Sequence, residues 1–483
     1  MTEEHLGQRA ARGTVWAGVD KFSVLAITFV VNIVMARILS VSDYGLVGMI
    51  YIFTNLSNVL VDGGFGNALI QKKNPTQTDF STIFFWNLGL ALALYALLYL
   101  CAPLIARFFS IPELVGVTRA IALIVIFNAL VIIQVNRLRK QLAFRTLAIV
   151  NISAAVVGGA CGIAMARAGY GVYSIVWYQV ITGATQFVVI YALGRWLPSL
   201  QFSLRTFRSL FGFGGFLLAA NLLQVFCNNL QNVIIGRKFS ASQLGLYSQA
   251  QKIDQIVSYH IPQILVQVMF PVYSKLQDED ERLREMLGMN MRVVAFFIFP
   301  LITLLIMLAE PVFELLYGAR WLGSAPYFRI LCCGGFFVAL QNINFYAVAA
   351  KGRSRTLFNW SFYKWGFLLL CMLAGIKFGI RGLLWGLAIS NFNIFMVNAF
   401  LAQKYVGFKV GAQARILAPL FGLSGLSAAV TLAVVKLAAV NVWFSIPLFI
   451  MIYLSVSYSA RMRAATEATA ALRTACGINK ATR

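Results

Sequence analysis

Charged residues are scarce in this sequence. Only 12% of the 483 residues are Asp, Glu, Lys or Arg, whereas 60% are hydrophobic and the mean hydropathy is +0.78. A soluble globular domain has roughly 25% charged residues. The shortage excludes an ordinary soluble protein and indicates a chain that folds within a lipid bilayer.

The sequence is also poor in side chains that bind metal ions. It has two histidines, His5 and His260, far apart, and no Cys-x-x-Cys pair among its seven cysteines. A zinc site and a disulfide framework are therefore not expected. The GxxxxGK[ST] loop that binds ATP phosphates is absent as well. We predict no metal, no cofactor and no direct use of ATP.

Long soluble segments are missing too. No loop between apolar runs exceeds roughly 20 residues, so there is no room for a soluble catalytic domain and the chain is not expected to be an enzyme. The N-terminal region lacks the uninterrupted apolar core and cleavage site of a signal peptide, because Asp20 and Lys21 interrupt it. We expect the first span to belong to the mature protein.

What the sequence does contain is a series of apolar runs near the length that crosses a bilayer. Polar breaks separate them into about 14 predicted transmembrane helices, because a spanning segment must pair all its backbone groups. The predicted fold class is therefore all-α, a polytopic membrane protein. The spans cover residues 14–36, 44–66, 80–102, 115–135, 146–166, 171–193, 209–236, 244–270, 289–308, 324–350, 356–376, 382–403, 413–435 and 440–460.

Basic residues outnumber acidic ones, with 40 Lys and Arg against 16 Asp and Glu and a net charge of +24. Membrane proteins collect Lys and Arg in their cytoplasmic loops. A cytoplasmic N-terminus places most of these residues on the inner side, so we predict that both termini are cytoplasmic. The basic tail, residues 461–483, is expected to contact anionic membrane lipid. Only the remaining cations are available to bind an anion.

The sequence contains an internal repeat. Residues 32–46, NIVMARILSVSDYGL, align without a gap on residues 232–246, NVIIGRKFSASQLGL, and residues 145–147 match residues 355–357, both RTL. Six spans in each repeat make the repeats parallel, related by an axis along the membrane normal. The predicted organisation is an N-terminal lobe (1–200, spans 1–6), a C-terminal lobe (201–405, spans 7–12), two further spans (406–460) and the cytoplasmic tail (461–483).

Three lysines, Lys21, Lys252 and Lys364, fall inside predicted spans. Lys21 lies about 10 Å from the predicted end of its helix, and the other two lie about 12 Å from theirs. A charge at mid-bilayer costs ~2.5–3.5 kcal/mol, so such residues usually face a bundle interior or a wet cavity. We predict that the three lysines form a cationic cavity that binds a phosphate or an acidic sugar. Snorkelling of each lysine to the membrane surface is the alternative.

Polar side chains accompany the lysines on the predicted helices. Four in the eighth span recur at helical spacing and share one face, namely Lys252, Gln255, Tyr259 and Gln263. The first and seventh spans carry similar stripes. The predicted cavity-lining polar residues are Asn32, Asn228, Gln255 and Tyr259. Hydrogen bonds between neighbouring helices are the alternative role of such amides.

Three acidic residues also fall within predicted spans. Asp20, Asp62 and Asp254 are predicted to bind a coupling proton or sodium ion, or to balance the lysine charges. Asp20 is adjacent to Lys21, but adjacent residues of a helix do not face each other, so Asp20 is a poor partner for that lysine.

Several ordered motifs resemble those of one protein family. After Trp16 in the first span, the sequence has ARILSVSDYG (36–45), DGGFGNALIQKK (62–73), FPVYSKLQDEDERL (270–283) and LLYGARWLGSAPYFRIL (315–331). Together they resemble Wzx-type polysaccharide flippases over nearly the whole chain. These proteins belong to the multidrug/oligosaccharidyl-lipid/polysaccharide exporter superfamily. The resemblance implies two six-helix lobes in a V, plus two C-terminal helices.

The resemblance also implies a function. A protein of this kind moves undecaprenyl-diphosphate-linked oligosaccharide units by alternating access, from the cytoplasmic to the periplasmic leaflet of the bacterial inner membrane. The product serves O-antigen, capsule or exopolysaccharide synthesis, and the expected protein partners are a polysaccharide polymerase and chain-length proteins, with no nucleic acid. The alternatives are an ion-coupled multidrug extruder of the same superfamily, a membrane enzyme of sugar chains, and a non-transporting scaffold.

Overall fold

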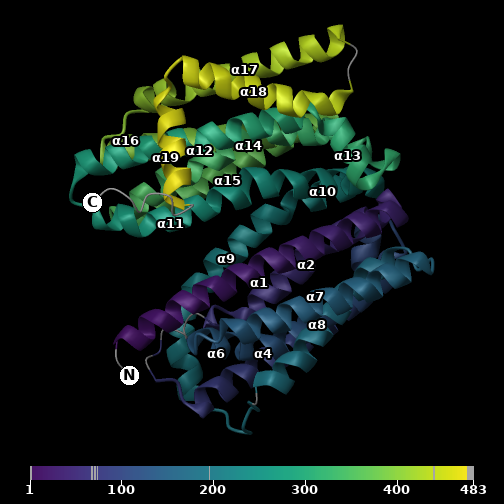
Figure 1. Cartoon of the computed structure of the whole chain (residues 1–483). Coiled ribbons are helices and arrows are strands. Elements are labelled where there is room, and N and C mark those ends of the chain that lie inside the picture. The colour runs from purple at the N-terminus through teal and green to yellow at the C-terminus, as the bar shows by residue number, and fades with distance from the viewer. Residues whose placement is uncertain are drawn as a thin grey trace. The chain divides into compact units, whose positions relative to one another are not determined.

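The computed structural model describes residues 3–66, 69, 72, 74–194, 196–438 and 441–475 of the chain. Within these residues it contains helices and no strand, which confirms the expected all-α class. The chain divides into two compact units, Met1–Gly245 and Leu246–Arg483. Figure 1 shows the helices of both units.

The first unit is built from eight described helices. They are α1 (Glu3–Ile38), α2 (Val41–Asp62), α4 (Gln77–Phe109), α5 (Leu114–Ile121), α6 (Leu123–Lys140), α7 (Phe144–Arg167), α8 (Val172–Gly194) and α9 (Leu204–Lys238). Helix α7 packs along both α1 and α8, as Figure 1 shows. Helix α2 packs on α9.

Helix α10 crosses the division between the units, and the remaining helices belong to the second unit. They are α10 (Ala241–Gln255), the π-helix η1 (Ile256–His260), α11 (Ile261–Lys275), α12 (Asp280–Met307), α13 (Ala309–Tyr317), the 3-10 turn η2 (Ala319–Trp321), α14 (Ser324–Ala350), α15 (Ser354–Ile376), α16 (Gly379–Val406), α17 (Val410–Leu437), η3 (Val442–Phe444), α18 (Ser445–Ser459) and α19 (Arg463–Ala475).

The described helices confirm the predicted series of membrane spans. Twelve of them are long and apolar enough to cross a bilayer, counting α5 with α6 and η3 with α18. These twelve coincide with twelve of the predicted spans. The spans predicted at 209–236 and 244–270 correspond to α9 and to the continuous helix formed by α10, η1 and α11.

Two helices of the first unit begin with the same capping arrangement. In α2 the Ser40 hydroxyl accepts a hydrogen bond from the Asp43 backbone, and the Asp43 carboxylate accepts one from the Ser40 backbone. Thr76 and Asp79 repeat this box at the start of α4. Asp79 also pairs with Lys72 at 2.7 Å and is buried. This capping box gives hydrogen-bond partners to backbone N–H groups of the first helix turn, which have no partner within the helix.

Replacing Asp79 with alanine is expected to lower the free energy of unfolding by about 2 kcal/mol, because a helix cap and a charge-assisted hydrogen bond are lost together. Asp43→Ala is the matched control, since it removes only the capping acid, and we expect about 1 kcal/mol. Unfolding of the purified protein in detergent, followed by circular dichroism, measures both. Equal losses would contradict a stabilising Lys72 pair.

The internal repeat reappears as two similar helix–turn–helix segments. The repeated segments form the turn between α1 and α2 and the turn between α9 and α10. A Cβ atom added to Gly45 would lie 1.8 Å from the Ala241 carbonyl oxygen, and one added to Gly245 would lie 2.0 Å from that of Val41. Each contact joins the first residue of one helix to a repeated glycine of the other. The two helices therefore cross at a symmetric point where only glycine fits.

A second repeated feature lies at the ends of α6 and α14. Lys140, the last residue of α6, donates to the carbonyl oxygens of Leu69, at 3.1 Å, and of Lys72. Lys351, directly after α14, donates to the carbonyl of Gln277 and to the carboxylate of Asp280. In each unit a lysine thus binds the linker that precedes another membrane helix. We call these two contacts the lysine clamps.

The C-terminal tail is docked over part of its length. Its helix α19 packs on α12, with Ala464, Ala465 and Ala468 buried. Arg292 of α12 donates two hydrogen bonds of 2.7 Å to the Glu467 carboxylate. This part of the tail thus packs on another helix of the second unit, because small residues let α19 approach α12 closely. Lipid contact by its remaining surface stays a prediction.

Candidate functional site

The three predicted lysines lie on three helices and in two units. Lys21 is on α1 in the first unit and is exposed, whereas Lys252 on α10 and Lys364 on α15 are half-buried in the second unit. Helices α10 and α15 begin earlier than predicted, so each of these two lysines lies about 15 Å from its helix start. A common cavity for all three lysines stays a prediction.

Lys364 contacts an aromatic side chain of a neighbouring helix. Its Nζ lies 5.2 Å from the centre of the Phe345 ring on α14, a cation–π contact. The adjacent Tyr363 accepts a hydrogen bond of 3.3 Å from Asn393 on α16. Lys364 is therefore half-buried against α14, with its ammonium group over an aromatic ring.

Asp20 is held by amides and not by a lysine. Both of its carboxylate oxygens accept hydrogen bonds from Asn151 of α7, at 3.1 and 3.0 Å. Asn151 in turn accepts a hydrogen bond of 3.3 Å from Gln186 of α8. No Lys or Arg within the described residues forms an ion pair with Asp20. The arrangement agrees with the expectation that Lys21 is a poor partner and gives a polar carboxylate site between three membrane helices.

The other two predicted acids differ in depth. Asp62 is the last residue of α2, close to Gly66 and within electrostatic range of Arg139, so it lies at a helix end. Asp254 lies inside the continuous helix and accepts a hydrogen bond of 2.8 Å from Ser258. Of the two, only Asp254 lies near the middle of a membrane segment.

Some residues of the predicted polar stripes are exposed, and others contact a neighbouring helix. Asn228, Gln255 and Tyr259 are exposed and Asn32 is half-buried. Gln263, in contrast, hydrogen-bonds to Asn342 and Tyr346 of α14, at 2.8 and 3.0 Å. For Gln263 the alternative of an interhelical contact is therefore the correct one. The π-helix η1 lies between Gln255 and Gln263 and changes the helical phase, which separates the two faces.

The sequence prediction missed an amide network in the first unit. Asn55 of α2 donates to Asn229 of α9 at 3.3 Å, and Asn58 of α2 accepts from Asn128 of α6 at 2.9 Å. The two α2 residues are one helical turn apart, and this spacing was the available signal. These hydrogen bonds connect α2 to α9 and to α6.

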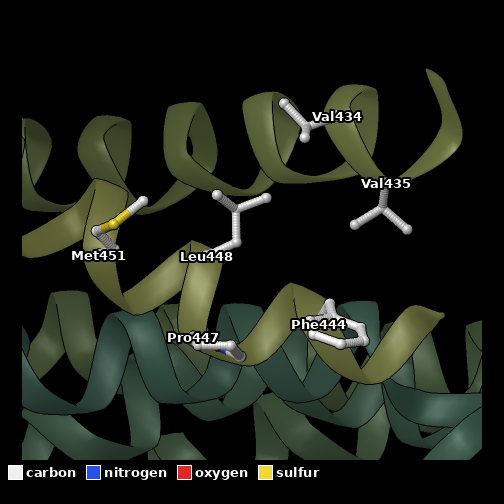
Figure 2. Close-up of a pocket in the computed structure, with 6 residues that line it drawn as sticks. All are labelled: Val434, Val435, Phe444, Pro447, Leu448 and Met451. Atoms are coloured by element: carbon white, nitrogen blue, oxygen red, sulfur yellow. The ribbon is translucent and has the colours of Figure 1, made fainter. Parts of the chain in front are cut away.

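An apolar groove lies between α17 and α18, with a volume of about 350 Å³. Figure 2 shows its lining side chains, which come from both helices and from η3. They are Val434, Val435, Phe444, Pro447, Leu448 and Met451. None of the six is polar, so the groove fits a hydrocarbon chain and excludes a charged head group.

Comparison with known proteins gives the family. The teichuronic acid biosynthesis protein TuaB of Bacillus subtilis is 27% identical over 407 residues, which cover 83% of each chain. The lipopolysaccharide biosynthesis protein WzxC of Escherichia coli is 24% identical over 411 residues, 83% of this chain and 82% of WzxC.

Among solved structures, the lipid II flippase MurJ in an inward closed conformation is similar with a TM-score of 0.72 and 16% identity. The similarity covers 93% of this chain and 100% of that one. At this identity the likeness shows the fold, and it confirms the expected transporter fold. Residues 34–326, more than half of the sequence, match the family model described as polysaccharide biosynthesis protein. The chain therefore belongs to the polysaccharide biosynthesis protein family.

Proposed function

We propose that this protein moves a lipid-linked oligosaccharide from the cytoplasmic to the periplasmic leaflet of a bacterial inner membrane. The observation that carries the proposal is the family match, together with relatives named for teichuronic acid and lipopolysaccharide biosynthesis. The many membrane helices and the likeness to a lipid II flippase support it. Both termini are cytoplasmic in this proposal, and the chain acts as a transporter rather than an enzyme.

In this proposal, different parts of the protein bind the head group and the lipid chain of the substrate. The anionic diphosphate or an acidic sugar binds Lys21, Lys252 and Lys364, because hydrogen bonds between ions are stronger than neutral ones. The polyprenyl chain stays in lipid or enters the apolar groove between α17 and α18. Motion of one lobe, residues 1–200, against the other, residues 201–405, then exposes the head group on the opposite side.

The proposal includes ion coupling and assembly partners. No ATP-binding motif occurs, so net direction comes from consumption of the product or from a proton or sodium gradient. Asp20, hydrogen-bonded across three helices, is a site where such an ion can bind. A polymerase and chain-length proteins are the partners that would consume the product.

The test measures translocation of an undecaprenyl-diphosphate-linked oligosaccharide in proteoliposomes. We expect transport by the wild type and a loss of at least about a hundredfold in the Lys21→Gln, Lys252→Gln, Lys364→Gln triple variant, since each hydrogen bond to a charged group contributes ~1.5–3 kcal/mol. The control triple variant carries the same change at three exposed lysines, Lys238, Lys275 and Lys377.

Each result has a defined meaning. Transport by the control and not by the test variant supports both the flippase and its lysine site. Equal transport by all three proteins keeps the flippase but removes the lysine site. No transport by the wild type, with substrate and orientation verified, rejects the flippase in favour of a drug extruder or a scaffold.

A further inference from the structure

One positive charge lies inside the membrane part of three packed helices. Residues 330–350 of α14, 356–376 of α15 and 382–403 of α16 contain a single charged side chain, that of Lys364. It lies near the middle of α15. No acid within the described residues forms an ion pair with it. Since an ionisable residue at such a depth usually faces a bundle interior or a wet cavity, Lys364 can bind a ligand of opposite charge.

Two aromatic side chains accompany Lys364 on the surface of α15. Trp360 lies four residues before Lys364 and three before Tyr363, so it is a neighbour of both on the helix. The rings of Trp360 and Tyr363 lie 5.4 Å apart, centre to centre, at an interplanar angle of 80°. Trp360 is 37% exposed and Tyr363 is 44% exposed. We call Trp360, Tyr363 and Lys364 the α15 triad.

The most apolar exposed side of α15 lies elsewhere on the helix. The exposed apolar residues at helical spacing are Phe358, Phe362, Leu369 and Leu373. Such a stripe is the side of a membrane helix that meets lipid. Phe362 is two residues from both Trp360 and Lys364, which places it about 160° around the helix from each. Contact with lipid along this stripe therefore does not account for the exposed part of Trp360.

Neighbouring helices hold the polar groups of the triad. Asn393 of α16 donates a hydrogen bond of 3.3 Å to the Tyr363 hydroxyl oxygen. Because that oxygen accepts, the hydroxyl proton of Tyr363 is left to donate to a ligand. The Lys364 ammonium group lies 5.2 Å from the centre of the Phe345 ring of α14, and its N–H groups can donate as well.

The chemistry of the triad matches a sugar that carries one negative charge. A pyranose ring has hydroxyl groups around its rim and C–H groups on its faces, so it can pack on an aromatic ring while its rim forms hydrogen bonds. Trp360 supplies the aromatic ring, and Tyr363 supplies a hydroxyl donor. The Lys364 ammonium group pairs with a carboxylate, and a charge-assisted hydrogen bond is about twice as strong as a neutral one.

A diphosphate fits this place less well. It carries more than one negative charge, and phosphate sites in proteins combine several cations or unpaired backbone N–H groups. The triad offers one cation in the middle of a helix, where the backbone N–H groups are already paired within the helix. A single lysine balances a single carboxylate.

We propose that the α15 triad binds an acidic sugar residue of the oligosaccharide, with the carboxylate at Lys364, a face of the sugar on Trp360 and a hydroxyl group at Tyr363. The proposal rests on the proposed function and names the class of glycan that this site selects. Asn393 is a positioning residue, because it acts through the Tyr363 hydroxyl.

Thiol labelling tests whether the triad faces water. Trp360→Cys and Phe362→Cys are each made in a protein without other cysteines and are labelled in liposomes by a membrane-impermeant reagent. The thiolate reacts, and it forms poorly in apolar surroundings, so we expect Trp360→Cys to react at least about tenfold faster. Equal rates would place Trp360 in lipid as part of an aromatic belt and would overturn the proposal.

Saturation-transfer nuclear magnetic resonance on the full-length protein in detergent tests the ligand. The probes are D-glucuronate, D-glucose and inorganic pyrophosphate. We expect D-glucuronate to bind at least about tenfold more tightly than D-glucose, because the neutral sugar cannot form the charge-assisted hydrogen bond. Equal binding of the two sugars, or binding of neither, would overturn the proposal. Displacement of D-glucuronate by pyrophosphate at equal concentration would also overturn it, since Lys364 would then bind the diphosphate.

Substitutions in the triad separate the charge from the aromatic surface. Lys364→Gln should abolish the preference for D-glucuronate, Lys364→Arg should keep it, and Trp360→Ala should weaken the binding of both sugars. The matched controls are Lys377→Gln and Trp385→Ala, at exposed positions outside the triad, and they should bind as the wild type does. A preference that persists in Lys364→Gln would overturn the proposal.

The positioning role of Asn393 has its own readout. Tyr363→Phe and Asn393→Ala should each weaken the binding of D-glucuronate severalfold, and the double variant should bind no more weakly than Tyr363→Phe, since both changes act on one hydroxyl. Additive losses would contradict this role. None of these measurements uses transport, so a flippase of neutral glycans fails here and still translocates, whereas failure of the proposed function leaves sugar binding intact.

Discussion

Replacing Trp321 with alanine is expected to lower the free energy of unfolding by about 3–5 kcal/mol, the range measured for removal of large buried aromatic side chains. Trp321 is fully buried in the η2 turn. Its ring lies 5.9 Å from Tyr317, which lies 5.8 Å from Phe313, and Phe313 packs on Phe328 at 5.5 Å. Alanine would leave a cavity in this cluster, which joins α13 to α14.

Trp385→Ala is the matched control for this substitution. Trp385 is 48% exposed on α16, so its removal leaves no cavity and should cost less than about 1 kcal/mol. Unfolding in detergent micelles, followed by far-ultraviolet circular dichroism, compares the two variants without relying on tryptophan emission. Similar losses of stability in the two variants would contradict a central role for the aromatic cluster.

The Gly45→Ala change should lower the free energy of unfolding by about 3 kcal/mol, the upper end of the usual cost of overpacking. The added methyl group would lie 1.8 Å from a carbonyl oxygen of α10, and a backbone oxygen cannot turn aside as a flexible side chain can. Relief requires α2 and α10 to move apart. Because Gly245 occupies the equivalent place, Gly245→Ala should have a similar effect.

The control is Gly89→Ala on α4, where no atom lies within 4 Å of the added group. Alanine has the higher helix propensity, so this variant should be at least as stable as the wild type. The double variant of Gly45 and Gly245 should cost less than the sum of its parts, since one separation of the helices relieves both clashes. Fully additive losses would show that the two contacts are independent.

The membrane spans could be predicted because their length is set by the bilayer. The helix ends could not, because local contacts set them. Helix α1 begins at Glu3, well before the apolar run, and α12 begins with the acidic residues Asp280 and Glu281, which favour a helix N-terminus. The short α13 was missed as well, since its stability comes from tertiary packing of its aromatic side chains.

The candidate site was predicted residue by residue, but its contacts were not. Spacing placed Gln263 on one stripe with Lys252, but it could not show the π-helix between them or the hydrogen bonds of Gln263 to α14. Asp254 and Ser258 are four residues apart across the start of η1, and their side chains hydrogen-bond to each other. The close approach of Gly335 on α14 to Ser258 and Asp254 depends on another helix, and a single sequence does not show it.

The motifs that resemble the flippase family perform structural roles where the structure describes them. Ser40 and Asp43 cap α2, Gly63 ends it in a left-handed conformation, and Trp321 fills the aromatic cluster. The residues that form turns and buried clusters are required by the fold, whichever glycan the protein binds. Such motifs therefore identify the family, whereas the substrate must be read from other positions.

The lysines of the lysine clamps have two roles, one during membrane insertion and one in the folded protein. With the proposed cytoplasmic termini, Lys140 and Lys351 would belong to the basic segments that orient a nascent chain in the membrane. In the finished protein the same ammonium groups donate to linker carbonyls, and Lys351 also to a carboxylate. An arginine at either place would preserve the orientation signal while presenting a planar fork in place of a compact donor. Substitution with arginine at these two residues can thus separate membrane insertion from final folding. Insertion depends only on the positive charge, whereas the folded contacts depend on the geometry of the side chain that bears the charge.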